Sequence, residues 1–69
     1  MRNVFQETEK LLIRKIVDPD LNFEQLTDDE YCLIEEKIGD YYTFLCQNFD
    51  RHPDIHICGD ILDQLARLE

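Results

Sequence analysis

The stretch from Thr27 to Phe49 constrains the fold more than any other part of the sequence. It opens with Thr27-Asp28-Asp29-Glu30, where the threonine hydroxyl can accept a hydrogen bond from the Glu30 N–H and the glutamate can accept one from the Thr27 N–H. Three acidic residues in the first turn also suit the positive end of the helix dipole. Apolar residues then recur at helical spacing: Tyr31, Ile34, Ile38, Tyr42, Leu45 and Phe49. The pattern predicts one long helix from about residue 28 to residue 49 or 50.

The apolar arc of this helix is wider than one neighbouring element needs. Leu33 and Phe44 are eleven residues apart and nearly coincide in projection, and with Tyr41 they extend the arc beyond the main stripe. A helix that packs against one neighbour needs an apolar stripe of about 100°, and this arc covers roughly twice that. The polar arc is narrow: Cys32, Glu36, Asp40, Thr43 and Gln47. We expect the helix to be central and to touch two elements, or one element and another chain.

A shorter amphipathic segment precedes the long helix. From about residue 3 to residue 17, apolar residues fall on one helical face: Phe5, Leu12 and Ile16, with Ile13 at its edge. Asp18-Pro19 ends this helix, because a residue before proline avoids the α region. The connector that follows, to residue 26, is too apolar for a free linker. We expect its apolar residues to lie on the core: Leu21, Phe23 and Leu26.

A third amphipathic segment follows Arg51-His52. Pro53 suits the first turn of a helix, and Asp54 suits the positive end of its dipole. The apolar face of this segment consists of Ile55, Cys58, Ile61, Leu62, Leu65 and Leu68. A short loop between two amphipathic helices implies that the second and third helices form an antiparallel αα-hairpin.

These segments predict an all-α fold, a small three-helix bundle in which an N-terminal helix packs on the hairpin. We expect residues 1–69 to form one small helical domain. In a chain this short, apolar burial and conformational entropy nearly cancel, so we expect an oligomer or a stabilising partner. The predicted core is Tyr31, Ile34, Ile38, Leu45, Ile61, Leu62 and Leu65. Gly39 and Gly59 lie within predicted helices, where each either permits a close helix crossing or is simply tolerated.

The charge of the chain is unevenly distributed. The net charge is −9, and it divides into a surplus of two positive charges up to Val17 and eleven negative charges after it. So acidic a body would repel phosphates, which argues against direct nucleic-acid binding. The acidity favours a basic partner, or it serves solubility alone.

The three cysteines are an odd number without tight spacing, and no apolar run resembles a secretory signal or a membrane span. We therefore expect a reduced cytoplasmic setting, no membrane association, and thiols that are mostly buried as small hydrophobic groups.

Candidate catalytic and metal sites find little support in the spacing. His52, His56, Cys46 and Cys58 lie close in sequence. However, His56 and Cys58 point to opposite sides of a helix, and no known zinc-ligand spacing is present. The paired carboxylates fall on polar arcs, and so small a bundle has little room for a catalytic pocket. We expect no enzyme activity, no metal and no cofactor.

Two functional interpretations remain. In the first, the chain is a small regulatory protein of the adaptor, inhibitor, antitoxin or immunity type that binds a basic partner surface; a nucleic-acid mimic is one special form. In the second, it is a self-assembling structural module, a homodimer in which charge serves solubility. Both use the same candidate interaction surface: Leu33, Tyr41, Phe44, Glu36 and Asp40.

Overall fold

The computed structural model describes residues 5–67 and places three helices in them. These are α1 (Glu7–Ile16), α2 (Asp28–Asn48) and α3 (Pro53–Arg67). No strand occurs within residues 5–67. The all-α prediction and the position of the longest helix are therefore confirmed, and Leu68 lies outside the described residues.

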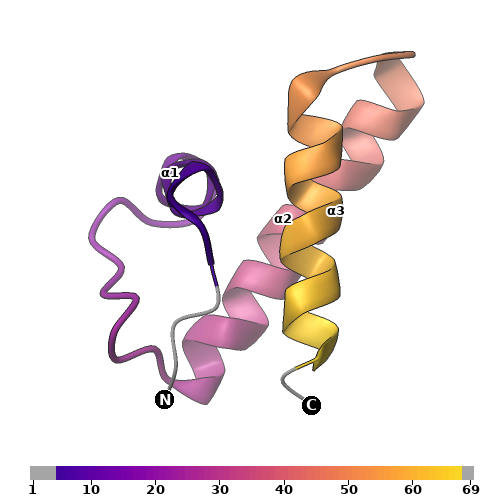
Figure 1. Cartoon of the computed structure of the whole chain (residues 1–69). Helices are drawn as coiled ribbons and strands as arrows, with labels where there is room; N and C mark the ends of the chain where they lie inside the picture. The colour runs from indigo at the N-terminus through magenta and orange to yellow at the C-terminus, as the bar shows by residue number, and fades with distance from the viewer. Residues whose placement is uncertain (1–4, 68–69) are drawn as a thin grey trace.

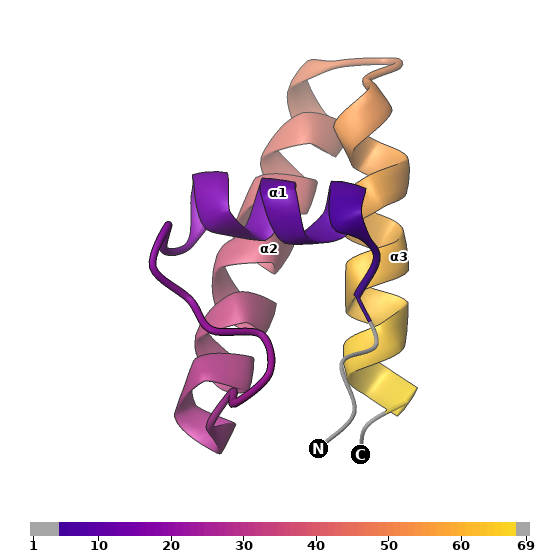
Figure 2. The same cartoon turned by 60° about the vertical axis from the view of Figure 1, so that its left-hand side comes forward.

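Helices α2 and α3 run side by side in opposite directions and form a hairpin (Figure 1). Helix α1 lies across one face of that hairpin and contacts both of its helices (Figure 2). The connector between α1 and α2 runs back along the same side. The predicted arrangement, an N-terminal helix packed on an αα-hairpin, is confirmed.

The predicted capping box forms at the start of α2. The Glu30 N–H donates to Thr27 Oγ1 at 3.2 Å, and the Thr27 N–H donates to Glu30 Oε1 at 2.8 Å. Thr27 itself has an extended backbone, with φ −84° and ψ 166°. Two of the backbone N–H donors that the N-terminal end of a helix exposes are thereby satisfied within four residues.

Helix α1 begins later than predicted, at Glu7 rather than near residue 3. The Gln6 N–H donates to Glu9 Oε1 at 2.9 Å, which fixes Gln6 as the residue before the helix. The same Glu9 oxygen accepts a hydrogen bond from Gln64 Nε2 of α3 at 2.9 Å. Glu9 is only 4% exposed, so this carboxylate both starts α1 and joins it to α3.

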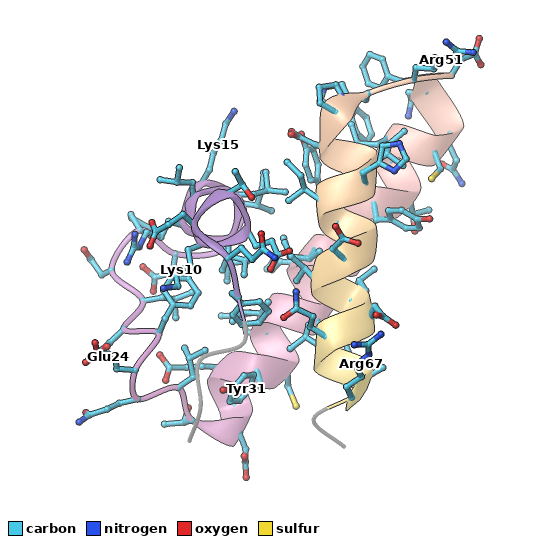
Figure 3. All side chains as sticks on the ribbon, viewed as in Figure 1. Lys10, Lys15, Glu24, Tyr31, Arg51 and Arg67 are labelled. Atoms are coloured by element: carbon cyan, nitrogen blue, oxygen red, sulfur yellow. The ribbon has the colours of Figure 1, made fainter. Side chains whose placement is uncertain are left out.

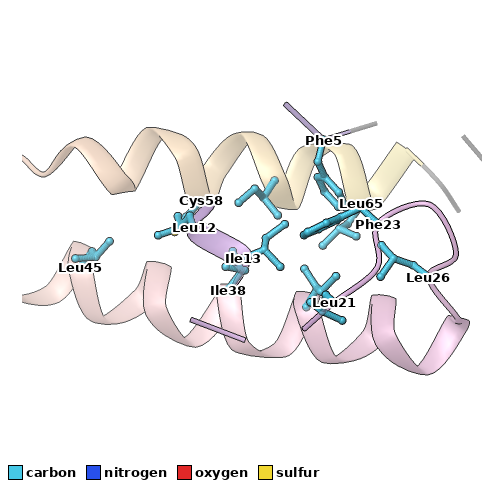
Figure 4. Close-up of a cluster of buried hydrophobic side chains, with 12 residues drawn as sticks. Phe5, Leu12, Ile13, Leu21, Phe23, Leu26, Ile38, Leu45, Cys58 and Leu65 are labelled. Carbon is cyan, nitrogen blue, oxygen red and sulfur yellow. The ribbon is translucent and has the colours of Figure 1, made fainter. Parts of the chain in front are cut away.

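The core lies where α1 and the connector meet the hairpin (Figure 4). Its buried side chains are Phe5, Leu12, Ile13, Leu21, Phe23, Leu26, Ile34, Ile38, Leu45, Cys58, Ile61 and Leu65. The predicted burial of the connector residues is confirmed. Tyr31 and Leu62 were also predicted in the core, but they are only partly buried and pack against its edge. Ile13, predicted at the edge of its helical face, has no exposed area, because α1 lies over two helices and is covered on both flanks.

Phe23 joins the N-terminal region to the connector. Its ring meets the Phe5 ring edge to face at 6.0 Å between centroids, and the Arg14 guanidinium carbon lies 5.0 Å from its centroid. The arginine therefore covers an aromatic ring of the core while its charge stays near the surface.

The two glycines are tolerated rather than required by a close helix crossing. A Cβ atom added to Gly39 would meet nothing within 4 Å, and one added to Gly59 would lie 4.0 Å from Tyr42 Cε1. That distance is an ordinary van der Waals contact.

Replacing Thr27 with alanine should lower the free energy of unfolding by about 1 kcal/mol, because the first turn of α2 loses its hydroxyl acceptor. Urea denaturation measures the change. Thr43→Ala is the matched control: the Thr43 hydroxyl donates to the Gly39 carbonyl within the helix at 3.0 Å, so its loss leaves no orphaned helix terminus. Equal midpoints for Thr27→Ala and the parent would place the start of α2 elsewhere.

Gly39→Ala should raise the free energy of unfolding by about 1 kcal/mol, because alanine loses less backbone entropy in a helix and the added methyl group meets no atom. Thermal denaturation followed by circular dichroism measures it. A loss of stability would mean that the added methyl group clashes with another atom, contrary to the open space beside Gly39.

Candidate interaction surface

Two large apolar side chains on α2 lie outside the core. Leu33 is 37% exposed and Phe44 is 53% exposed. Each directly precedes a buried residue, Ile34 and Leu45 respectively, and is therefore turned about 100° away from it around the helix axis. Helices α1 and α3 thus fill the inner part of the wide apolar arc, and the outer part faces solvent.

Charged residues lie between and beside these two apolar positions. Glu36, Lys37 and Asp40 are all exposed, and Lys37 and Asp40 stand at i+4 and i+7 from Leu33, on the same side of the helix. We call the set formed by Leu33, Glu36, Lys37, Asp40 and Phe44 the α2 outer face. It is apolar at both ends and carries two carboxylates and one ammonium group in the middle.

Tyr41 takes a different position from the other predicted surface residues. It is partly buried and packs against the core, and its hydroxyl donates to Asp54 Oδ2 at 2.7 Å. This hydrogen bond, then burial, then the Asp54 charge raise the pKa of Tyr41 from 10.0 to about 12. Tyr41 therefore ties α2 to the first turn of α3, at the border of the α2 outer face. Its contact with a partner stays a prediction.

An aromatic cluster extends the surface toward the turn between α2 and α3. The Phe44 and Phe49 rings meet at 6.2 Å between centroids, and the Phe49 and His52 rings meet at 5.4 Å. Phe49 continues the apolar spacing of α2 in the sequence, yet it is 45% exposed. The reason is its backbone: α2 ends at Asn48, and Phe49 is extended, with φ −136° and ψ 135°, so the helical spacing no longer positions its side chain.

The turn itself is hollowed. A shallow depression of about 580 Å³ is lined by Asp50, Arg51, His52, Pro53, Ile55 and His56, and Arg51 marks its place at the tip of the hairpin in Figure 3. His52 has a structural role there, because its Nδ1 accepts a hydrogen bond from the Asp54 N–H at 3.1 Å. This contact replaces the usual serine or aspartate cap of α3, and the sequence pattern did not indicate it.

The cysteines differ from the prediction. Only Cys58 is buried, whereas Cys32 and Cys46 are exposed. Cys32 lies on the polar arc of α2, whereas Cys46 lies close enough to Cys58 of α3 to influence its ionisation. Burial raises the pKa of the Cys58 thiol to about 11, and Asp54 and Cys46 add to the shift, so this thiol stays protonated at neutral pH.

Within residues 5–67, no group of three or more histidine, cysteine, aspartate or glutamate side chains is placed to hold a metal ion. Over the same part of the chain, no helix has the length and apolar character needed to cross a membrane. Comparisons with protein-family models, with curated proteins and with solved structures found no match.

Tyr41→Phe should lower the free energy of unfolding by about 1 kcal/mol at pH 7, because the hydrogen bond to Asp54 is lost. The raised pKa gives the effect a pH dependence. The hydroxyl contributes fully below pH 10, its ordinary value, and the contribution disappears as the pH rises toward 12, where folded Tyr41 ionises. Urea denaturation from pH 7 to pH 11 measures the difference between parent and variant. Tyr42→Phe is the control, and an equal loss in both variants would contradict the assignment.

Proposed function

We propose that this chain is a small, non-enzymatic interaction protein that regulates or recruits a partner protein by binding it through the α2 outer face. The observation that carries the proposal is the exposure of Leu33 and Phe44 on a helix whose inner face already packs against two other helices. Burying such side chains against a partner removes apolar area from water without disturbing the core.

The partner should offer apolar sites at two points along a line. Leu33 and Phe44 are eleven residues apart, a separation of about 16 Å along the helix at 1.5 Å per residue. Phe49 adds a second aromatic ring beside Phe44. Aromatic and aliphatic side chains of this kind act as anchors, and they chiefly set how long a complex lasts.

The charge of the chain indicates which charge the partner's surface should carry. Glu36 and Asp40 lie between the two anchors, and the whole chain carries a net charge of −9. A basic surface would be steered toward it, and a surface with lysine or arginine near its apolar sites would pair with these carboxylates. A partner whose contacting surface is acidic would be repelled. The proposal is therefore a binder of basic, partly apolar protein surfaces.

Self-assembly through two copies of the α2 outer face is the second candidate, favoured by the same exposed apolar pair. A symmetric dimer of this kind would bring Glu36 and Asp40 of both copies together, with one Lys37 from each copy to offset them. The like charges disfavour that arrangement relative to a partner of opposite sign. We therefore place the symmetric dimer second.

The test is a double substitution, Leu33→Gln with Phe44→Gln. Because both side chains are exposed, the variant should keep its helicity and remain within about 0.5 kcal/mol of the parent in unfolding free energy. It should fail to capture from a native host extract the proteins that the parent captures, and with a purified partner it should bind at least 100-fold more weakly. Glu36→Gln with Asp40→Asn should instead slow association and reduce its dependence on salt.

Two further variants calibrate the result. Ala66→Gln changes an exposed residue of α3 and should alter neither folding nor binding. Leu45→Gln places a polar group in the core, where the parent side chain is 1% exposed, and should unfold the chain. If the double variant unfolds as Leu45→Gln does, the two residues belong to the core. If it captures the same proteins as the parent does, the α2 outer face is not the binding surface.

A further inference from the structure

The outer side of α1 carries a second exposed apolar residue in a basic setting. Leu11 is 61% exposed, the highest value among the large apolar side chains of residues 5–67. The two residues that follow it, Leu12 and Ile13, are buried, so Leu11 points away from the hairpin. Lys15, one helical turn further along, is also exposed and projects outward from α1 in Figure 3.

Two basic groups remain available at this end of α1. Lys10 is paired with Glu7 at 3.6 Å, and its side chain is only 19% exposed. Arg14 stacks on Phe23, an uncharged partner, and takes part in none of the ion pairs found within residues 5–67. Lys15 has no ion pair among the contacts of residues 5–67. We call Leu11, Arg14 and Lys15 the α1 outer face. It combines one apolar anchor with two positive charges.

The α1 outer face and the α2 outer face are complementary in charge. The first is apolar and basic, the second apolar with two carboxylates against one lysine. They lie on different helices of one molecule, and α1 stands to one side of the hairpin (Figure 1). They also match in spacing, because Leu11 and Lys15 are four residues apart on α1 and Asp40 and Phe44 are four residues apart on α2, about 6 Å along the axis in each case.

We propose that the partner of the α2 outer face is the α1 outer face of a second copy of this chain. This inference rests on the proposed function and identifies its partner. Leu11 of one copy packs against Phe44 of the next, and Arg14 and Lys15 meet Glu36 and Asp40. Because the two faces differ, the contact is heterologous: each copy in a chain of molecules uses both faces, and each end leaves one face free.

The contact is small and reversible. One short helix laid on another buries less area than a standard stable interface, so assembly depends on protein concentration. The net charge of −9 on each copy opposes assembly at low ionic strength. At physiological ionic strength the Debye length is about 8 Å, which screens this long-range repulsion more than the directly contacting pairs. Association should therefore be strongest at intermediate salt and weaken at high salt.

The test uses two variants, each defective on one face. The α1 variant carries Leu11→Gln and Lys15→Glu, and the α2 variant carries Leu33→Gln and Phe44→Gln. Sedimentation velocity on the parent from 10 µM to 1 mM should show species growing beyond the dimer. Each variant alone should remain a monomer with unchanged helicity. The equimolar mixture should form a 1:1 dimer and nothing larger, since only one intact pair of complementary faces remains.

The inference is wrong if the parent stays monomeric throughout the concentration range, or if the mixture of the two variants stays monomeric. It is also wrong if the α1 variant still dimerises by itself, because that result would indicate a symmetric α2 contact. If the α1 variant unfolds, Leu11→Gln alone replaces it, with the same expected result. A monomeric parent whose α2 variant loses capture of a host protein would end this inference and leave the proposed function standing. A monomeric parent whose α2 variant keeps that capture would end both.

Discussion

The inner face of α2 is the contact on which the rest of the structure depends. Ile34, Ile38 and Leu45 on this face are at most 1% exposed, and they meet α3 along the hairpin and α1 where it crosses. A helix has only one such face, so the two neighbours must share it. Once α1 and α3 have filled the inner part of the apolar arc, Leu33 and Phe44 are left outside the core, where Phe44 contacts the exposed Phe49 ring. The exposed surface is therefore a consequence of how the core is built.

Polar contacts fix the geometry that this apolar packing leaves open. Glu9 caps α1 and accepts a hydrogen bond from Gln64 of α3, and Tyr41 binds Asp54 at the other end of the hairpin. These two bonds join separate helices at sites that are buried or half-buried, where a lost partner would leave an uncompensated polar group. Together they set how far α1 lies along α3 and how the two helices of the hairpin align.

The sequence indicated most of the fold because its signals are local. The Thr27 capping box, the apolar spacing up to Leu45 and the proline at the start of α3 each act within a few residues, and each appears in the structure. The errors arose where tertiary contacts or helix ends decide the outcome. Ile13 is buried because α1 crosses two helices. Phe49 is exposed because α2 ends at Asn48, one residue before it.

The candidate surface was predictable only in part. The width of the α2 apolar arc indicated Leu33 and Phe44, but no sequence pattern could separate Tyr41 from them, because its hydrogen bond partner belongs to α3. Leu11 was not predicted because it lies off the apolar face of α1, and an isolated leucine among charged residues gives no periodic signal. The two outer faces became visible only when burial in the folded chain was known.

The apolar arc of α2 divides into a buried inner part and an exposed outer part. The most direct measurement is solvent paramagnetic relaxation enhancement of side-chain protons, recorded on the folded chain at low concentration. We expect strong enhancement at Leu33 and Phe44 and little at Ile34 and Leu45. Protection of Leu33 and Phe44 equal to that of Leu45, under conditions where the chain is monomeric, would place both residues in the core instead.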